Sequence, residues 1–93
     1  MKVLVKYTAQ LRTAIQRAEE VIEFTEATSL SDLLAHLADR HDGGRPHLLG
    51  SNGKVNACLL VVVNESAVAA SEAASWQLNE GDVVLLLPPI AGG

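Results

Sequence analysis

The sequence has few basic residues, one cysteine and no long apolar run. Seven lysines and arginines stand against eleven acidic residues, a net charge of −4. This balance argues against a nucleic-acid-binding protein, which needs a basic surface. The single cysteine, Cys58, excludes an internal disulfide and fits a cytoplasmic protein. No apolar run approaches the length of a membrane span. From the charge balance and the short apolar runs, we expect neither a nucleic acid nor a membrane as partner.

Signals for processing and for several domains are also missing. Lys2 and Lys6 interrupt the apolar segment 1–11, and no small-residue cleavage site is present, so this segment is not expected to be a signal peptide. The sequence shows no repeat, low-complexity tract or interdomain linker. With 93 residues, of which 48% are hydrophobic, the chain can form one core but not two.

The first half of the chain predicts a β-hairpin followed by a helix. Residues 2–7 and 20–24 are rich in β-branched residues, and a hairpin is their simplest arrangement. The connection between them has the pattern of a helical turn around residues 11–15. Ser29 is a predicted N-cap, with Asp32 three residues later. Apolar residues then recur at helical spacing on one face, namely Leu30, Leu33, Leu34, Leu37 and Ala38.

The second half predicts three strands and their connections. Residues 45–54 are rich in Gly, Asn, Ser and His and are expected to form an exposed loop. Strands are predicted at residues 57–63, 67–68 and 83–87, whereas residues 69–77 give no clear assignment. The predicted order is β-β-α-β-β-β. This order indicates an α+β fold, with a mixed sheet of four or five strands and one main helix packed on one face.

The second face of this sheet needs an explanation. One helix can cover only one face, yet both alternating sets of side chains are apolar in residues 58–63 and 83–87. Either loops such as 45–54 fold over the second face, or this face is an apolar patch for a partner protein. Periodicity alone does not choose between the two.

The last residues of the sequence have the composition of an extended arm. Pro88-Pro89 favours an extended backbone, while Gly92-Gly93 has no side chains and can add little stability. The functional group at the tip is the Gly93 carboxylate, which can enter a narrow enzyme channel. We therefore expect a domain at residues 1–87 and an extended, flexible tail at residues 88–93.

This ending resembles the C-terminal signature of the ubiquitin-like sulfur carriers, the family of the molybdopterin synthase small subunit and the thiamine-biosynthesis sulfur carrier. The signature runs from Leu78 through Gly81-Asp82 to the Pro-Pro-aliphatic-small-Gly-Gly end. Further similarities follow the family's order along the chain, at Lys2-Val3-Leu4, Gln10-Leu11-Arg12, residues 28–37 and Val63-Asn64-Glu65. The resemblance covers nearly the whole chain and implies a ubiquitin-like β-grasp fold.

The resemblance also implies a carrier cycle centred on Gly93. In this family an E1-like activating enzyme uses ATP to adenylate the terminal glycine carboxylate, and a sulfur donor then converts the adenylate to a thiocarboxylate. In a molybdopterin synthase the tail inserts into the large subunit, which holds the catalytic acids and bases, and a heterotetramer is expected. The chain would then donate sulfur without catalysis of its own and without a stably bound cofactor or metal. The implied site is Gly92 and Gly93, with a partner interface at Leu87, Pro88, Pro89, Ile90 and Ala91.

Several details leave the pathway open. Leu86-Leu87 stands where molybdopterin members often have phenylalanine, and the segments 8–19 and 69–77 are longer than in compact members. Pro88-Pro89 favours the molybdopterin branch, whereas residues 90–93 also resemble carriers for thiamine thiazole and cysteine synthesis. Two other interpretations are a β-grasp interaction module whose carboxylate only docks and protein conjugation through the terminal glycine.

Other candidate residues receive structural interpretations. The spacing of His36, His41 and His47 puts at most two on one surface, without a cysteine or carboxylate cluster, so solvated or loop histidines are expected rather than a metal site. Gly43-Gly44 lacks the Lys-Ser/Thr pair of a phosphate loop and is expected to end the helix. Cys58 is expected to be a core thiol.

Overall fold

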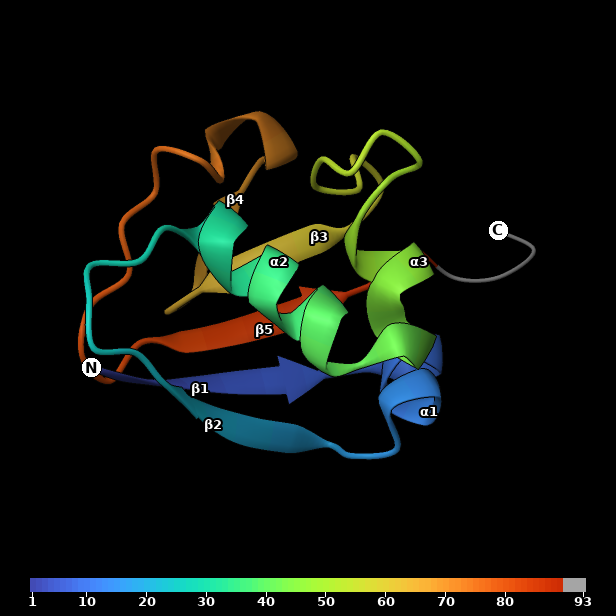
Figure 1. Ribbon diagram of the computed structural model, residues 1–93, viewed down its shortest axis with the longest axis horizontal. Helices are drawn as coiled ribbons and strands as arrows, with labels where there is room; N and C mark the ends of the chain where they lie inside the picture. Colours follow the sequence, from blue (N-terminus) through green and yellow to red (C-terminus); the bar gives the residue numbers. More distant parts are fainter. Residues whose placement is uncertain (90–93) are drawn as a thin grey trace.

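The structure, a computed structural model, describes residues 1–89 and shows a mixed five-stranded sheet (Figure 1). The strands lie in the order β2-β1-β5-β3-β4. Only the central pair, β1 and β5, runs parallel. Their bounds are β1 (Lys2–Tyr7), β2 (Glu19–Glu23), β3 (Leu60–Val63), β4 (Ser66–Val68) and β5 (Val83–Leu87). The predicted α+β architecture of the β-grasp type is confirmed.

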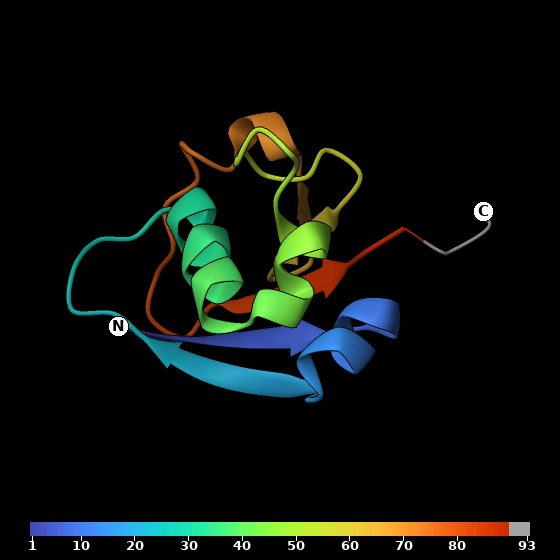
Figure 2. The same ribbon diagram turned by 45° about the vertical axis from the view of Figure 1, so that its right-hand side comes forward.

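In the described part of the chain, three helices accompany the sheet. They are α1 (Ala9–Ile15), α2 (Leu30–Arg40) and α3 (Arg45–Leu48), with short 3₁₀ turns at Asp42–Gly44 and Ala70–Glu72. Two views show α2 and α3 on the same side of the sheet, while α1 lies at the end where β1 and β5 finish (Figures 1 and 2). Within residues 1–89, none of these helices has the length and apolar character that crossing a bilayer requires.

Helix α2 forms as its sequence predicts. Ser29 Oγ accepts a hydrogen bond from the Asp32 backbone N–H at 3.0 Å, and the Asp32 carboxylate accepts one from the Ser29 N–H at 3.3 Å. This capping box satisfies two backbone donors that the helix start would otherwise leave free. The predicted apolar face is fully buried, at Leu30, Leu33, Leu34, Leu37 and Ala38. Burial of its four leucines contributes about 6–12 kcal/mol before entropy is subtracted, so α2 is the main cover of the core.

The prediction that residues 45–54 form an exposed loop is wrong in its first part. Residues 45–48 form α3, and Leu48 is fully buried. Pro46 lies in the first turn of α3, where a missing N–H leaves no hydrogen bond unmade. Gly44 allows the chain to approach α1, because a Cβ there would lie 2.9 Å from Ile15 Cδ1. The composition of this segment hid a short helix that packs beside α2.

The strand predicted at residues 57–63 is also shorter than expected. It begins at Leu60, because the Asn56 side-chain oxygen accepts the Cys58 backbone N–H at 3.0 Å and turns the chain before the sheet. Cys58 is exposed, so the prediction of a core thiol is wrong. The helical turn expected around residues 11–15 extends to the seven-residue helix α1.

Candidate functional site

Strand β5 lies at the centre of the sheet and leads directly into the predicted tail. It pairs with β1 through Tyr7 opposite Leu86, and with β3 through Leu60 opposite Leu87. Its buried residues, Val84 and Leu86, belong to the core, while the alternate residues are half-buried on the other face. The core therefore fixes both the position and the direction of the strand that precedes the terminal residues.

The face of the sheet opposite α2 is apolar in its middle and charged along β2 and β1. We define the outer sheet face by the side chains that the strand registers place on it, namely the apolar Leu4, Val21, Leu60, Val62, Ala67, Val83, Leu85 and Leu87 and the charged Lys2, Lys6, Glu19 and Glu23. Two of the apolar side chains are large and strongly exposed, Val21 at 60% and Leu60 at 49%. The explanation in which loop 45–54 covers this face is wrong, because its helix α3 lies on the side of α2 (Figure 2).

A shallow hollow lies near the middle of the outer sheet face. Leu85 stands between Lys6 of β1 and Val62 of β3 in the strand registers. The polar side chains Asn64 and Glu65 line the same hollow. An apolar centre with polar groups at its margin is the usual anatomy of a protein interface.

The start of α1 holds both the end of β5 and the residues that follow it. Thr8 Oγ1 donates a hydrogen bond to the Leu86 carbonyl at 3.0 Å, and Gln10 Nε2 donates one to the Pro89 carbonyl. Pro88 is buried and Pro89 is exposed. These contacts were not found from the sequence, because each joins residues almost eighty positions apart.

The remaining predicted site residues lie outside the part of the chain that the structure describes. These are Ile90, Ala91, Gly92 and Gly93, and their predicted roles stay predictions. Of the predicted interface, the structure describes Leu87, which is half-buried on the outer sheet face, together with Pro88 and Pro89.

The start of α1 has two locally unfavourable features. Ala9 has a φ of 50°, in the left-handed region that costs about 1–2 kcal/mol for a residue with a Cβ. Thr8 is the N-cap residue, yet its hydroxyl makes no capping bond, a loss of about 1 kcal/mol. Instead it bonds Leu86. Helix stability alone does not explain this arrangement.

We expect Ala9→Gly to stabilise the protein by about 0.5 kcal/mol, because relief of the left-handed strain exceeds the extra chain entropy that glycine loses. The matched control is Ala35→Gly, at a solvent-exposed position within α2. This variant should be less stable than wild type by about 1 kcal/mol. Urea unfolding of the two variants measures the difference. Equal losses in both would contradict a strained Ala9.

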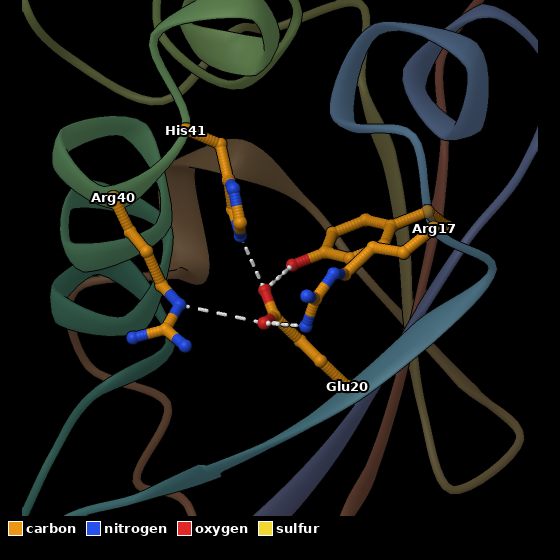
Figure 3. Close-up of polar contacts among 5 residues, drawn as sticks. Arg17, Glu20, Arg40 and His41 are labelled. Carbon is orange, nitrogen blue, oxygen red and sulfur yellow. Dashed lines mark hydrogen bonds and ion pairs between the residues drawn. The ribbon is translucent and has the colours of Figure 1, made fainter.

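A buried carboxylate forms a second polar cluster, at the end of the sheet near α1 (Figure 3). Glu20 Oε1 contacts the Tyr7 hydroxyl and His41 Nε2, each at 2.5 Å. Its Oε2 contacts an Arg17 terminal nitrogen at 2.8 Å and Arg40 Nε at 3.4 Å. The Glu20 side chain is 4% exposed, so it is a buried charge with four partners. It joins β1, β2 and the C-terminal ends of α1 and α2.

The protonation states of this cluster follow from its contacts. Burial raises the pKa of Glu20, but the hydrogen bonds from Tyr7 and His41, with the charge of Arg17, outweigh burial and hold that pKa below its ordinary value. Burial, and then the adjacent Glu20 carboxylate, raise the pKa of Tyr7. At neutral pH Glu20 is ionised and Tyr7 is protonated. Both carboxylate oxygens are occupied, so we interpret the cluster as a structural link.

The histidines have different surroundings. His41 lies in the connection after α2, one of the two predicted environments, and is half-buried against Glu20 rather than solvated. His36 is exposed and meets the Phe24 ring edge-on. Within residues 1–89, no group of three His, Cys, Asp or Glu side chains is placed to hold a metal ion.

Comparison with known proteins decides the family. The sequence profile described as the ThiS family matches residues 5–93. The chain belongs to the ThiS family. The predicted membership among the ubiquitin-like sulfur carriers is thereby confirmed. A search of curated proteins found no match.

Solved structures similar to this ThiS-family chain cover all or nearly all of its length. A putative molybdopterin converting factor subunit 1 from Pyrococcus furiosus is 31% identical, over 97% of this chain and 99% of that chain, with a TM-score of 0.73. A chain of the BexX/CysO complex of Amycolatopsis orientalis is 27% identical, over 98% of this chain and 99% of that chain, with a TM-score of 0.71. SAMP1 from Haloferax volcanii gives 24% and complete coverage of both chains, with a TM-score of 0.84. At that identity the last likeness shows the β-grasp fold alone.

Proposed function

We propose that this ThiS-family chain is a sulfur carrier and the small subunit of a molybdopterin synthase. The observation that carries the proposal is the placement of β5, which joins an apolar sheet face to a Pro-Pro-Ile-Ala-Gly-Gly end. One strand thus connects a surface suited to a partner protein with a carboxylate suited to a narrow channel.

The chemistry requires one reacting group on this chain. The Gly93 carboxylate is a poor electrophile, and attack on the α-phosphate of ATP converts it to an acyl adenylate, with pyrophosphate as leaving group. Hydrosulfide, the sulfur donor for which the step balances without a reductant, attacks the acyl carbon and displaces AMP, and the product is a thiocarboxylate that can act as a sulfur nucleophile. Gly92 has no side chain, so the segment before Gly93 can enter a narrow channel. ATP is consumed by the E1-like activating enzyme, so the chain needs no stably bound cofactor.

The partner roles divide between two surfaces. Leu87 to Ala91 line the path to the active site of a partner, and the outer sheet face supplies the apolar contact area. The Pyrococcus furiosus relative, named as a molybdopterin converting factor subunit, supports the molybdopterin synthase large subunit as that partner. We expect the cycle to operate in the cytoplasm, where the single cysteine would stay reduced.

The Amycolatopsis orientalis relative favours a second candidate function. CysO is seen there in complex with BexX, so a protein of this fold can also bind a different kind of partner. A carrier that donates sulfur for thiamine thiazole or cysteine synthesis would use the same Gly93 chemistry. The two candidates differ only in the enzyme that receives the sulfur.

Reconstitution separates these pathways. The thiocarboxylated chain is incubated with a molybdopterin synthase large subunit and the pyranopterin precursor, and in parallel with a thiazole synthase or a cysteine synthase and their substrates. We expect dithiolene formation in the first mixture only. Product in one of the parallel mixtures alone would overturn the molybdopterin assignment and leave the carrier chemistry standing.

Charge on the outer sheet face should prevent partner binding. We expect Leu60→Asp and Leu85→Asp each to weaken binding to the large subunit at least about 30-fold, because a carboxylate would be buried in the centre of the contact. Ala35→Asp, on the exposed surface of α2, is the control and should bind normally. Isothermal titration measures the affinity, and circular dichroism melting checks the fold. Normal binding by both folded variants would place the interface elsewhere.

A further inference from the structure

The backbone contacts that hold β5 stop just before the proline pair. The parallel pairing with β1 ends at Tyr7 opposite Leu86, and the antiparallel pairing with β3 ends at Leu60 opposite Leu87. The next two residues, Pro88-Pro89, have no N–H group to donate. Beyond Leu87, the sheet therefore offers no further hydrogen bonds to fix the direction of the chain.

Helix α1 replaces the missing strand contacts with side-chain donors. The Thr8 hydroxyl bonds the Leu86 carbonyl at 3.0 Å, and the Gln10 amide bonds the Pro89 carbonyl. The helix that carries them is itself firmly placed, because Leu11 is fully buried and Ile15 is 9% exposed. The two bonds lie on either side of Leu87 and Pro88, so together they define the course of this segment.

Both unfavourable features at the start of α1 lie at or beside these two donors. Thr8 gives up its capping bond, and Ala9, between Thr8 and Gln10, takes a φ of 50°. Backbone strain of this kind persists where the surroundings impose it, and it is concentrated at functional positions. Here the result is that two polar side chains of the helix start reach Leu86, near the end of β5, and Pro89, just after it.

We propose that Thr8 and Gln10 are positioning residues that set the direction in which the chain leaves β5 toward the reacting carboxylate. This inference rests on the proposed carrier function. A segment held in one direction before binding loses less conformational freedom when it enters the activating enzyme. The two bonds therefore lower the KM for the carrier. They touch no reacting atom, so kcat does not depend on them.

The test uses isosteric substitutions that remove each donor. Thr8→Val, Gln10→Leu and the double variant are compared with Thr25→Val and Gln77→Leu, which make the same changes at exposed positions. Adenylation is followed by ATP–pyrophosphate exchange with the activating enzyme of the same organism. We expect each single variant to raise the KM for the carrier about twofold to tenfold, the range of one hydrogen bond. The kcat should stay within about twofold, and Gln10→Lys, which keeps a donor, should restore part of the affinity.

Melting temperature and NMR separate positioning from folding. Pro88 and Pro89 follow the last sheet pairing, which is between Leu60 and Leu87, and their ¹³Cα order parameters should fall in the double variant while the melting temperature stays within about 2 °C. An unchanged KM, or a KM that rises only in step with a lower melting temperature, would overturn the inference. If the wild-type chain is not adenylated at all, the proposed function fails. The order parameters of Pro88 and Pro89 then decide the inference, and unchanged values refute it.

Discussion

Addition of one alanine after Gly93 is expected to abolish thiocarboxylate formation and leave the melting temperature unchanged. The added residue moves the carboxylate by about 3.5 Å and puts a methyl group where the channel is proposed to accept only glycine. A displacement of this size is enough to take a reacting group out of productive geometry. The buried core lies between Val3 and Leu86, so its packing is not affected. The intact mass after incubation with ATP, the activating enzyme and a sulfur donor shows whether the thiocarboxylate has formed.

The control for this extension is an alanine inserted between Ser51 and Asn52. These residues are exposed, in the connection between α3 and β3, and the insertion lengthens the chain equally without moving the carboxylate. It should carry sulfur normally. Sulfur carried by the extended protein would contradict the assignment of Gly93, and a large fall in its melting temperature would mean that the terminal residues stabilise the core.

The second large effect concerns the Glu20 cluster. Glu20→Gln should destabilise the protein by about 2 kcal/mol, because Arg17, Arg40 and the two buried donors lose an anionic partner. The two arginines are about half exposed and regain water, which limits the loss. For a domain of this size the melting temperature should fall by roughly 10 °C. Glu19→Gln, an exposed neighbour on β2, should change stability by less than about 0.5 kcal/mol.

Acid unfolding of the same proteins tests whether charge is the cause. The pKa of Glu20 is lower in the folded protein than in the unfolded chain. The ionised Glu20 side chain therefore stabilises the folded protein at pH values above its unfolded pKa of about 4.3. It is lost as the pH falls through the lower, folded-state pKa. The difference in unfolding free energy between wild type and Glu20→Gln should therefore be largest at pH 7 and become smaller below about pH 4. A constant difference down to pH 2 would show that shape, not charge, stabilises the cluster.

The sequence predicted the elements whose pattern is complete within one segment. Helix α2 carries its cap, at Ser29 and Asp32, and its buried face in consecutive turns. Strand β5 is apolar throughout. The 3.6-residue and two-residue periods are therefore visible without tertiary information. Helix α3 was missed because four residues span little more than one turn, too short for a helical period to appear.

The contacts at the candidate site could not be predicted because they join distant segments. Thr8 and Leu86 are 78 positions apart, and Gln10 and Pro89 are 79 apart. One local signal did exist for Glu20. It shares the inward-facing side of β2 with Ile22, and a charged residue at a core-facing position needs buried partners. The identity of those partners, however, depends on how α1 and α2 end near β2.

The central claim is that the Gly93 carboxylate is the group that carries sulfur. The most direct measurement is the intact mass of the chain after incubation with ATP, its activating enzyme and a sulfur donor, followed by fragmentation of the C-terminal peptide. The account predicts a mass increase equal to the replacement of one oxygen by one sulfur, located on Gly93. An unchanged mass with an activating enzyme that adenylates other carriers, or sulfur located on Cys58, would contradict it.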